Sequence, residues 1–319
     1  MIETKSKGVT RKADQRGSAP GADADGVSLS VVESRGFDDY RLLDSGRGRK
    51  LERFGRVVVD RPEPQAMWQP ICPQDVWGKA DAIFDGEDDA ESGKWRKARP
   101  VPESWNIHVK DVTLTCRLTS FRHLGIFPEQ LPHWEWMLER LGRMREGRPR
   151  VLNLFAYTGA ATLLAARAGA EVTHVDASKR AIAWAKENQQ ASNLEQAPIR
   201  WLLDDARKFV QREVRRGKTY NMILVDPPKF GRGPNNEVWD LFEHLPQLMR
   251  DCAALLDTSE AHLILTAYAI RASVLAIDQV AREALAGRGG TFSSGELAIR
   301  EESGARALPT SLFTRWSSQ

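Results

Sequence analysis

The sequence has 319 residues and a formal net charge of +3, with 28% charged and 41% hydrophobic residues. These values are typical of a globular protein long enough for two domains, and no run of about 18 apolar residues, the minimum for a membrane helix, occurs. The three cysteines, Cys72, Cys116 and Cys252, are far apart and odd in number, which favours a reduced, cytoplasmic protein over a disulfide or zinc framework. The histidines form no ligand-spaced pair, so we expect no metal, and the lack of a long apolar run indicates no membrane partner.

The first part of the chain divides into a tail and a small domain. Residues 1–26 are polar and rich in glycine, alanine and aspartate, and we expect a disordered tail. Residues 27–118 contain short β-like runs separated by turns. Period-two alternation over 105–109 and 112–118 predicts a hairpin or a long bent strand. We therefore expect a small β-rich domain here, serving as a platform for the substrate.

Residues 119–319 form the second expected domain. A connector and a helix at 132–145 precede alternating strands and helices. The strands are predicted at 151–156, 171–176, 199–203, 220–226 and 262–267, and the helices at 160–168, 178–192, 206–215, 238–256 and 273–286. Two final strands, 291–300 and 308–316, follow each other without a helix. This order predicts an α/β fold, a doubly wound sheet with an antiparallel C-terminal strand.

The first strand of this sheet runs into Phe155-Ala156-Tyr157-Thr158-Gly159-Ala160. Gly159 stands where the chain turns into a helix, and its missing side chain lets a ligand approach the backbone closely. A dinucleotide site needs two further glycines at fixed spacing; they are absent, which disfavours a pyrophosphate ligand. Asp176 ends the second strand, where an acid accepts from ribose hydroxyls; capping of the helix from Ser178 is the alternative.

The third strand is followed by Asp204-Asp205-Ala206. One carboxylate is placed to accept from the amine of an adenine while a nearby backbone N–H donates to its ring, with Asp205 favoured over Asp204. The other acid would cap the helix that begins at Ala206. A ligand with a ribose and an adenine but no phosphates accounts for these positions, and S-adenosylmethionine is the common one.

The fourth strand ends in Asp226-Pro227-Pro228-Lys229-Phe230, a rigid ledge with an aromatic tip over the crevice where open α/β sheets bind ligands. Together with the 155–159 turn and with Phe127-Pro128-Glu129-Gln130, the segment 226–233 resembles the class I S-adenosylmethionine-dependent methyltransferases of the large-subunit (23S) ribosomal RNA type. The resemblance covers about residues 40–316.

This resemblance implies a seven-stranded methyltransferase sheet, with the cofactor lying across the ends of its first two strands. The implied cofactor-binding residues are Phe155, Tyr157, Thr158, Gly159 and Ala160 at the methionine moiety, Asp176 and Ala177 at the ribose, Asp204, Asp205 and Ala206 at the adenine, and Gln130 over the cofactor. The implied catalytic residues, which line the target pocket, are Asp226, Pro227, Pro228, Lys229 and Phe230.

The acceptor atom decides which of these groups take part. For an exocyclic amine, Asp226 and the Pro227 carbonyl would accept its protons, Phe230 would stack on the base, and Lys229 would contact a phosphate unless it is a solvated surface lysine. Carbon-5 of a pyrimidine instead needs a cysteine thiolate. The related cytosine enzymes carry that cysteine after the fifth strand, where this chain has Thr266-Ala267-Tyr268, and Cys252 fits the core pattern of a helix. A nitrogen acceptor is therefore favoured.

Three functions agree with these observations. The favoured one is a methyltransferase acting on RNA, with the N-terminal domain and basic runs such as 94–99 and 212–218 holding the nucleic-acid backbone. A protein N-methyltransferase would use the same ledge. An RNA-binding assembly factor with an idle cofactor site is the third, against which the intact Asp176 and Asp226 speak.

Overall fold

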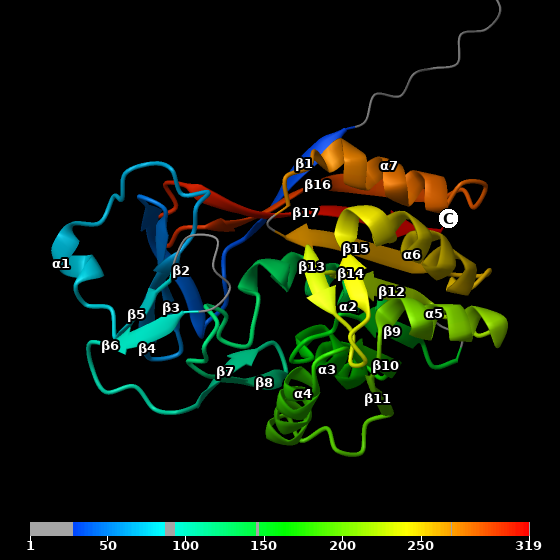
Figure 1. The fold of residues 1–319 in the computed structure, drawn as a ribbon, viewed down its shortest axis with the longest axis horizontal. Helices are drawn as coiled ribbons and strands as arrows, with labels where there is room; N and C mark the ends of the chain where they lie inside the picture. Colours follow the sequence, from blue (N-terminus) through cyan, green and yellow to red (C-terminus); the bar gives the residue numbers. More distant parts are fainter. Residues whose placement is uncertain (1–27, 87–92, 145–146, 269, 319) are drawn as a thin grey trace, which may run out of the picture.

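The computed structural model describes residues 28–86, 93–144, 147–268 and 270–318. The tail expected at 1–26 lies outside the described residues. Figure 1 shows two bodies side by side, a small β-rich one on the left and a larger α/β one on the right. None of the helices in the described ranges is long and apolar enough to cross a membrane.

The larger body is built on one mixed sheet of eight strands. Their order is β1 (Leu29–Ser34), β16 (Thr291–Arg300), β17 (Ala307–Ser317), β15 (His262–Tyr268), β12 (Met222–Val225), β9 (Arg150–Leu154), β10 (Glu171–Asp176) and β11 (Ile199–Leu203). All pairs are parallel except those that β17 makes with β15 and β16. The predicted α/β fold and its antiparallel C-terminal strand are confirmed, with one strand more than the seven expected.

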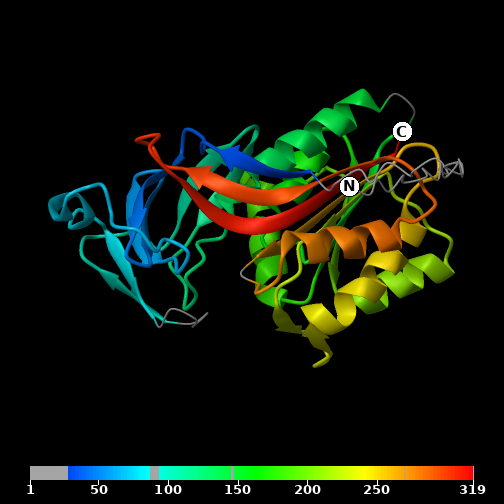
Figure 2. The same cartoon turned by 90° about the horizontal axis from the view of Figure 1, so that it is seen from above.

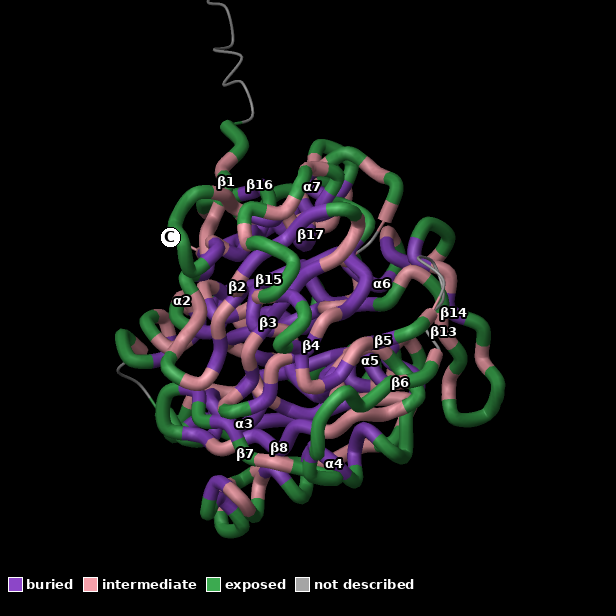
Figure 3. Tube along the Cα trace, turned by 90° about the vertical axis from the view of Figure 1, so that its left-hand side faces the viewer, coloured by how far each residue is buried: buried purple, intermediate pink, exposed green. Residues whose placement is uncertain are grey.

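The helices cover both faces of this sheet (Figure 2). One layer contains α2 (Leu131–Arg143), α3 (Ala160–Arg167) and α4 (Lys179–Ala191), and the other contains α5 (Ala206–Arg215), α6 (Leu241–Leu255) and α7 (Val274–Ala284). The central strands are buried on both sides and therefore read as continuous apolar runs. In the tube coloured by burial, buried segments fill the interior and exposed ones lie outside (Figure 3).

The additional strand, β1, comes from the segment that the sequence assigned to the small domain. Leu29 pairs with Ser294 in β16, at the other end of the chain, and the two strands run parallel. Val31 on the outer edge is 62% exposed, so this short strand lacks the apolar run of a central one. Nothing in its local pattern indicates so distant a partner.

The small body contains a five-stranded sheet and a separate hairpin. The sheet runs β2 (Tyr40–Gly46), β3 (Arg49–Phe54), β4 (Val57–Pro62), β5 (Ala82–Asp85) and β6 (Lys94–Lys97), with the short helix α1 (Gln74–Trp77) beside it. The hairpin of β7 (Trp105–Val109) and β8 (Val112–Cys116) confirms the predicted alternation. It contacts α4, where Trp184 Nε1 donates to the Thr115 carbonyl at 2.9 Å.

One continuous apolar cluster joins the two bodies. It contains Phe54 and Ile107 of the small body together with Leu164 of α3 and Val151 of β9. The opposite face of the large sheet has its own cluster against α5, α6 and α7. The small body is therefore fixed against the end of the large sheet, next to α3 and α4.

The region after β12 differs from the prediction. The helix expected at 238–256 begins at Leu241, and the preceding residues form a hairpin of β13 (Phe230–Arg232) and β14 (Val238–Asp240). The Asp240 carboxylate caps the helix by accepting from the Phe242 and Glu243 N–H groups at 2.9 and 3.3 Å. The cap therefore sets the start of the helix at Leu241, three residues later than the sequence pattern predicts.

We predict that Gly295→Ala removes β1 from the sheet. A methyl group on Gly295 would lie 1.7 Å from the Ser30 carbonyl oxygen, so the strands must separate. Loss of stability by about 1–3 kcal/mol is expected, in the range of an overpacked core. Thermal unfolding measures this, and hydrogen exchange of residues 29–34 should accelerate. The control is Gly142→Ala in α2, where the added methyl meets nothing within 4 Å. Unchanged exchange in Gly295→Ala would contradict the assignment of β1.

Candidate active site

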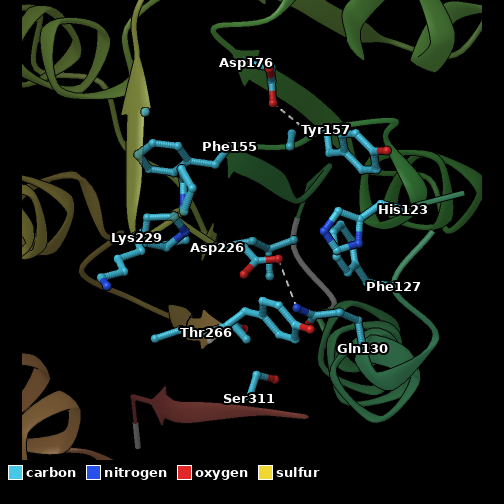
Figure 4. A pocket seen from close by; sticks show the side chains of 18 of the residues that line it. His123, Phe127, Gln130, Phe155, Tyr157, Asp176, Asp226, Lys229, Thr266 and Ser311 are labelled. Carbon is cyan, nitrogen blue, oxygen red and sulfur yellow. Dashed lines mark hydrogen bonds between the residues drawn. The ribbon is translucent and has the colours of Figure 1, made fainter. Parts of the chain in front are cut away.

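A cavity of about 1250 Å³ opens at the carboxyl ends of the parallel strands, between the large sheet and the small body. The segments that follow β9, β10, β11, β12 and β15 all contribute to its wall. The small body adds residues 63–65, and the connector adds 121–130 (Figure 4). Every segment that the sequence singled out as a candidate site lies in this wall.

The turn after β9 is held in an unusual backbone conformation. Gly159 has φ +84°, and the bulky residues Phe155 and Tyr157 also have positive φ, +55° and +50°. Such angles cost energy for side chains with a Cβ and persist only where the surroundings enforce them. Here the Thr158 hydroxyl donates to the Gly125 carbonyl, and the Tyr157 N–H donates to Asp176 at 2.8 Å. The turn is thus fixed in the shape that it presents to the cavity.

Asp176 stands at the end of β10 with both carboxylate oxygens on backbone donors. One accepts from the Tyr157 N–H and the other from the Ser178 N–H at 2.7 Å (Figure 4). Burial raises the pKa of Asp176, and these two hydrogen bonds act against that shift. The helix cap of α4 is Ser178, whose side chain accepts from the Ala181 N–H. Asp176 therefore does not cap the helix, and its remaining lone pairs are available at the cavity.

The two acids after β11 have different surroundings. Asp205 is buried and caps α5 by accepting from the Lys208 N–H at 3.0 Å. Asp204 is half-buried and pairs with Arg212. Asp205 is thus the acid that caps α5, and both acids line the cavity. Which of them contacts an adenine stays a prediction.

Asp226, at the end of β12, lies on the floor of the cavity beside a second acid. Glu129, in the short helix η1 (Pro128–Gln130), is buried, and its own pKa is raised by that burial. Burial and the nearby Glu129 raise the pKa of Asp226 from its ordinary 3.8 to about 7. Gln130 Nε2 donates to Asp226 Oδ2 at 3.0 Å (Figure 4). The Asp226 carboxyl and the Gln130 amide therefore meet at this point, and the Glu129 carboxyl is close enough to affect the pKa of Asp226.

The segment Pro227–Phe230, the ledge that follows Asp226, is held in place by Trp239 of the β13–β14 hairpin. Trp239 of β14 donates through Nε1 to the Pro228 carbonyl at 2.7 Å and packs on Phe155 with ring centroids 4.9 Å apart. Phe230 is 57% exposed at the cavity rim. The Lys229 amine lies 5.1 Å from the Phe230 ring centroid and points away from Asp226 (Figure 4). The hairpin that the sequence did not predict is thus what holds the predicted ledge.

Several lining residues were not among the predicted site residues. Glu129 stood in a quoted motif without a role, and its neighbour Gln130 was expected over the cofactor. His123, Phe127 and Tyr268 form an aromatic group in the wall. Two of them had a signal in the sequence: Phe127 opens the quoted motif 127–130, and Tyr268 lies at the carboxyl end of a parallel strand.

The positions of the cysteines and of possible metal ligands bear on the chemistry of this site. No cysteine is among the residues that line the cavity in the described part of the chain. Cys252 lies fully buried in α6, as predicted from the apolar pattern, and all three cysteines are free. Over the ranges that the structure describes, no three histidine, cysteine or acidic side chains are grouped so as to hold a metal ion.

Comparison with known proteins identifies the family. A crystallised S-adenosylmethionine-dependent methyltransferase from Agrobacterium tumefaciens is 51% identical to this chain, over 91% of this chain and 94% of that one, with a TM-score of 0.87. The chain belongs to the S-adenosylmethionine-dependent methyltransferases. A family model described as conserved hypothetical protein 95 also matches residues 137–272 of this methyltransferase.

Two curated relatives of this methyltransferase are named for ribosomal RNA. The ribosomal RNA large subunit methyltransferase I of Cronobacter sakazakii is 37% identical over 227 residues, which are 63% of this chain and 54% of that protein. The ribosomal RNA large subunit methyltransferase K/L of Chromohalobacter salexigens is 28% identical over 196 residues, 60% of this chain and 25% of that protein. The match thus spans from a quarter to about half of the length of these relatives.

We predict that Asp226→Asn stabilises this methyltransferase at neutral pH. Because the pKa of Asp226 is about 7 when folded and returns to 3.8 on unfolding, the unfolded chain releases this proton first as pH rises. Stability is unaffected below about pH 4, falls between about pH 4 and 7, and stays reduced above that. The asparagine variant escapes the loss, so its thermal midpoint should exceed that of wild type at pH 8, by about 2–4 °C for each kcal/mol recovered.

At pH 4 the same two proteins should unfold at nearly equal temperatures. The control is Glu243→Gln, an acid-to-amide change on a side chain that is 74% exposed on α6. A wild-type advantage at pH 8 would show that the Asp226 carboxyl is not held out of water.

Proposed function

We propose that this methyltransferase methylates an exocyclic amine nitrogen on a base of RNA, with ribosomal RNA as the substrate. The observation that carries the proposal is the floor of the cavity, where the Gln130 amide donates to the Asp226 carboxyl at 3.0 Å beside a second acid, Glu129, and where no cysteine is among the described lining residues. Carboxylates accept protons from an amine, whereas carbon-5 chemistry needs a thiolate. The names of the relatives supply the RNA part of the proposal.

The residues of the cavity fit the cofactor of the family. Gly159 is a tight position, since an added Cβ would lie 3.2 Å from the Ala185 Cβ as well as at positive φ. Asp176 offers lone pairs to ribose hydroxyls, and the acids at 204–205 offer them to an adenine amine. We assign the turn from Phe155 to Ala160 to the methionine moiety. When bound, S-adenosylmethionine supplies a methyl group that its sulfonium charge already makes reactive.

The protein then has to position the acceptor. Asp226 Oδ1 and the Pro227 carbonyl would accept the two protons of the amine and turn its lone pair toward the methyl group. Phe230 at the rim would stack on the base, because every base has a π-face. Lys229, with Arg232 and Arg271 in the same wall, provides cations for phosphate groups. These cations favour RNA over a peptide acceptor. The cytoplasmic location indicated by the cysteine pattern remains a prediction.

Asp226→Ala should abolish methyl transfer to RNA. The assay measures label from radioactive S-adenosylmethionine in total RNA from a strain lacking this gene, so that the acceptor sites are unmethylated. Loss of the proton-accepting group should lower the rate roughly 100-fold or more, while Glu243→Gln stays at the wild-type rate. Nucleoside digestion of the labelled RNA then identifies the methylated atom. Label in protein alone, or a labelled carbon-5, would overturn the proposal.

Asp176→Asn should weaken cofactor binding without unfolding the protein. The amide loses one acceptor and the negative charge, and a hydrogen bond to a charged group contributes about 1.5–3 kcal/mol, so the dissociation constant should rise roughly 10- to 100-fold. Calorimetric titration with S-adenosylhomocysteine measures this. Binding as tight as in wild type would remove Asp176 from the cofactor site.

A further inference from the structure

The half of the cavity that faces the small body is lined by an aromatic wall, defined by His123, Phe127 and Tyr268. The His123 and Phe127 ring centroids lie 4.8 Å apart, and Tyr268 lies 6.3 Å from His123 and 6.4 Å from Phe127. His123 and Phe127 stand across the cavity from Phe155 and Lys229 (Figure 4). None of the three follows the strands that carry the predicted cofactor contacts, although Phe127 packs on Tyr157 of the turn after β9 with ring centroids 5.5 Å apart. The wall therefore adjoins the cofactor half at Phe127.

The polar atoms of this wall have no task in the folded chain. Among the described residues, neither the His123 ring nitrogens nor the Tyr268 hydroxyl has a hydrogen-bond partner, although both side chains line the cavity. Burial lowers the pKa of His123 well below its ordinary value, and the nearby Arg61, Arg122 and Lys50 lower it further. The imidazole is thus neutral, with one donor and one acceptor. A ligand is the natural partner for these groups.

Acidic and basic side chains both line this half of the cavity. Asp226 and Glu129 are the acids, and Arg122 and the exposed Arg271 are the cations, with the Arg122 guanidinium 5.9 Å from the Tyr268 ring centroid. An aromatic surface beside both cations and acids suits a nucleotide, because the phosphate would pair with a cation while a proton donor on the base reaches an acid.

The hydrogen bond from Gln130 shows which kind of donor group the Asp226 carboxylate binds. Its side chain ends in a planar NH₂ group, and that group donates to Asp226 at 3.0 Å. The exocyclic amine of adenine, cytosine or guanine is the same planar NH₂ donor, while the corresponding carbonyl of uracil or hypoxanthine is an acceptor that a carboxylate repels. Asp226 is thus already bonded to a group that resembles the amine of a base.

We propose that the aromatic wall of His123, Phe127 and Tyr268 is the binding site for the acceptor base, whose exocyclic amine displaces the Gln130 amide from Asp226. This inference rests on the proposed function and deepens it, since it names the residues that select the acceptor. The base lies against the ring faces, its amino group reaches Asp226, and its phosphate meets Arg122. The wall residues contribute to the affinity for the acceptor base.

The first test uses free nucleoside monophosphates, with the cofactor half saturated by S-adenosylhomocysteine so that adenine cannot enter it. Three matched pairs differ only by amine against carbonyl or hydrogen: CMP and UMP, AMP and IMP, and GMP and IMP. Ligand-observed saturation-transfer NMR titration gives each dissociation constant. At least one amine-bearing nucleotide should bind about tenfold tighter than its partner, because its amine can replace the Gln130 amide on Asp226, whereas the carbonyl or hydrogen of the partner cannot donate to a carboxylate. Equal affinities in all three pairs would overturn the proposal.

The second test removes the ring of Tyr268. Tyr268→Leu should weaken the preferred nucleotide about 5- to 100-fold, the range of base stacking on one aromatic side chain, with S-adenosylhomocysteine affinity changed by less than about twofold. Tyr268→Phe keeps the ring and should recover most of the lost affinity. The matched control is Phe242→Leu, an aromatic residue on α6 that is 53% exposed and outside the cavity wall. Nucleotide binding in Tyr268→Leu equal to wild type would overturn the assignment.

These outcomes distinguish a failure of the proposed base-binding site from a failure of the proposed function. Nucleotides that bind by their amines and lose affinity in Tyr268→Leu support the wall even where RNA takes up no label, and only the RNA assignment then fails. RNA labelled equally well by wild type and Tyr268→Leu, with unchanged KM, overturns the wall while the proposed function stands. A rise in KM with little change in kcat supports the wall, because the ring would act on binding.

Discussion

The ion pair between Arg61 and Glu52 is the interaction on which the rest of the site depends. Both side chains are buried in the small body, where Arg61 Nη2 donates to Glu52 Oε1 at 2.9 Å and the Tyr40 hydroxyl donates to the same oxygen at 2.8 Å. Arg61 Nη1 also donates to the Arg122 carbonyl at 3.0 Å. The pair thereby ties the small sheet to the connector that carries His123 and Glu129. Buried charges are costly unless each is paired and hydrogen-bonded, and here both are.

Together with burial, the charged residues around the cavity shift the pKa values of two of its groups in opposite directions, lowering that of His123 and raising that of Asp226. Arg61 helps to keep His123 neutral, so the aromatic wall contributes ring surface without charge. Burial, together with the nearby Glu129, raises the pKa of Asp226 to about 7, so the floor holds a carboxyl whose proton is exchanged near neutral pH. A second ion pair, Arg306 with Asp44 at 2.8 Å, joins the β16–β17 end to the small body, and Arg306 also pairs with Glu301 of its own hairpin at 2.9 Å. The cavity thus has two walls from different parts of the chain, held at a fixed spacing.

Much of this could be predicted from the sequence because the relevant signals are local. Apolar runs alternating with helical patterns indicated the sheet, and the motifs at 155–160, 176, 204–206 and 226–230 lie together because parallel strands end at one edge. The features that were missed depend on distant partners. β1 pairs with β16 across the length of the chain, and the role of Glu129 depends on its position beside Asp226. Local patterns carry no information on such contacts.

The division of the cavity bears on how the acceptor should be inferred. The cofactor half consists mainly of strand ends, and the family resemblance depends on these and on the motif Phe127–Gln130 of the connector. Of the aromatic wall, His123 and Phe127 come from the connector, outside the matched stretch 137–272. Stacking, the neutral imidazole and the exchange of the Gln130 amide for a base amine are all decided on that side. Membership of the family therefore determines the methyl donor, whereas the acceptor is determined by a surface that exists only because the small body is fixed beside the sheet. The chemistry of that surface, two acids below and neutral rings above, favours an amine on a planar base.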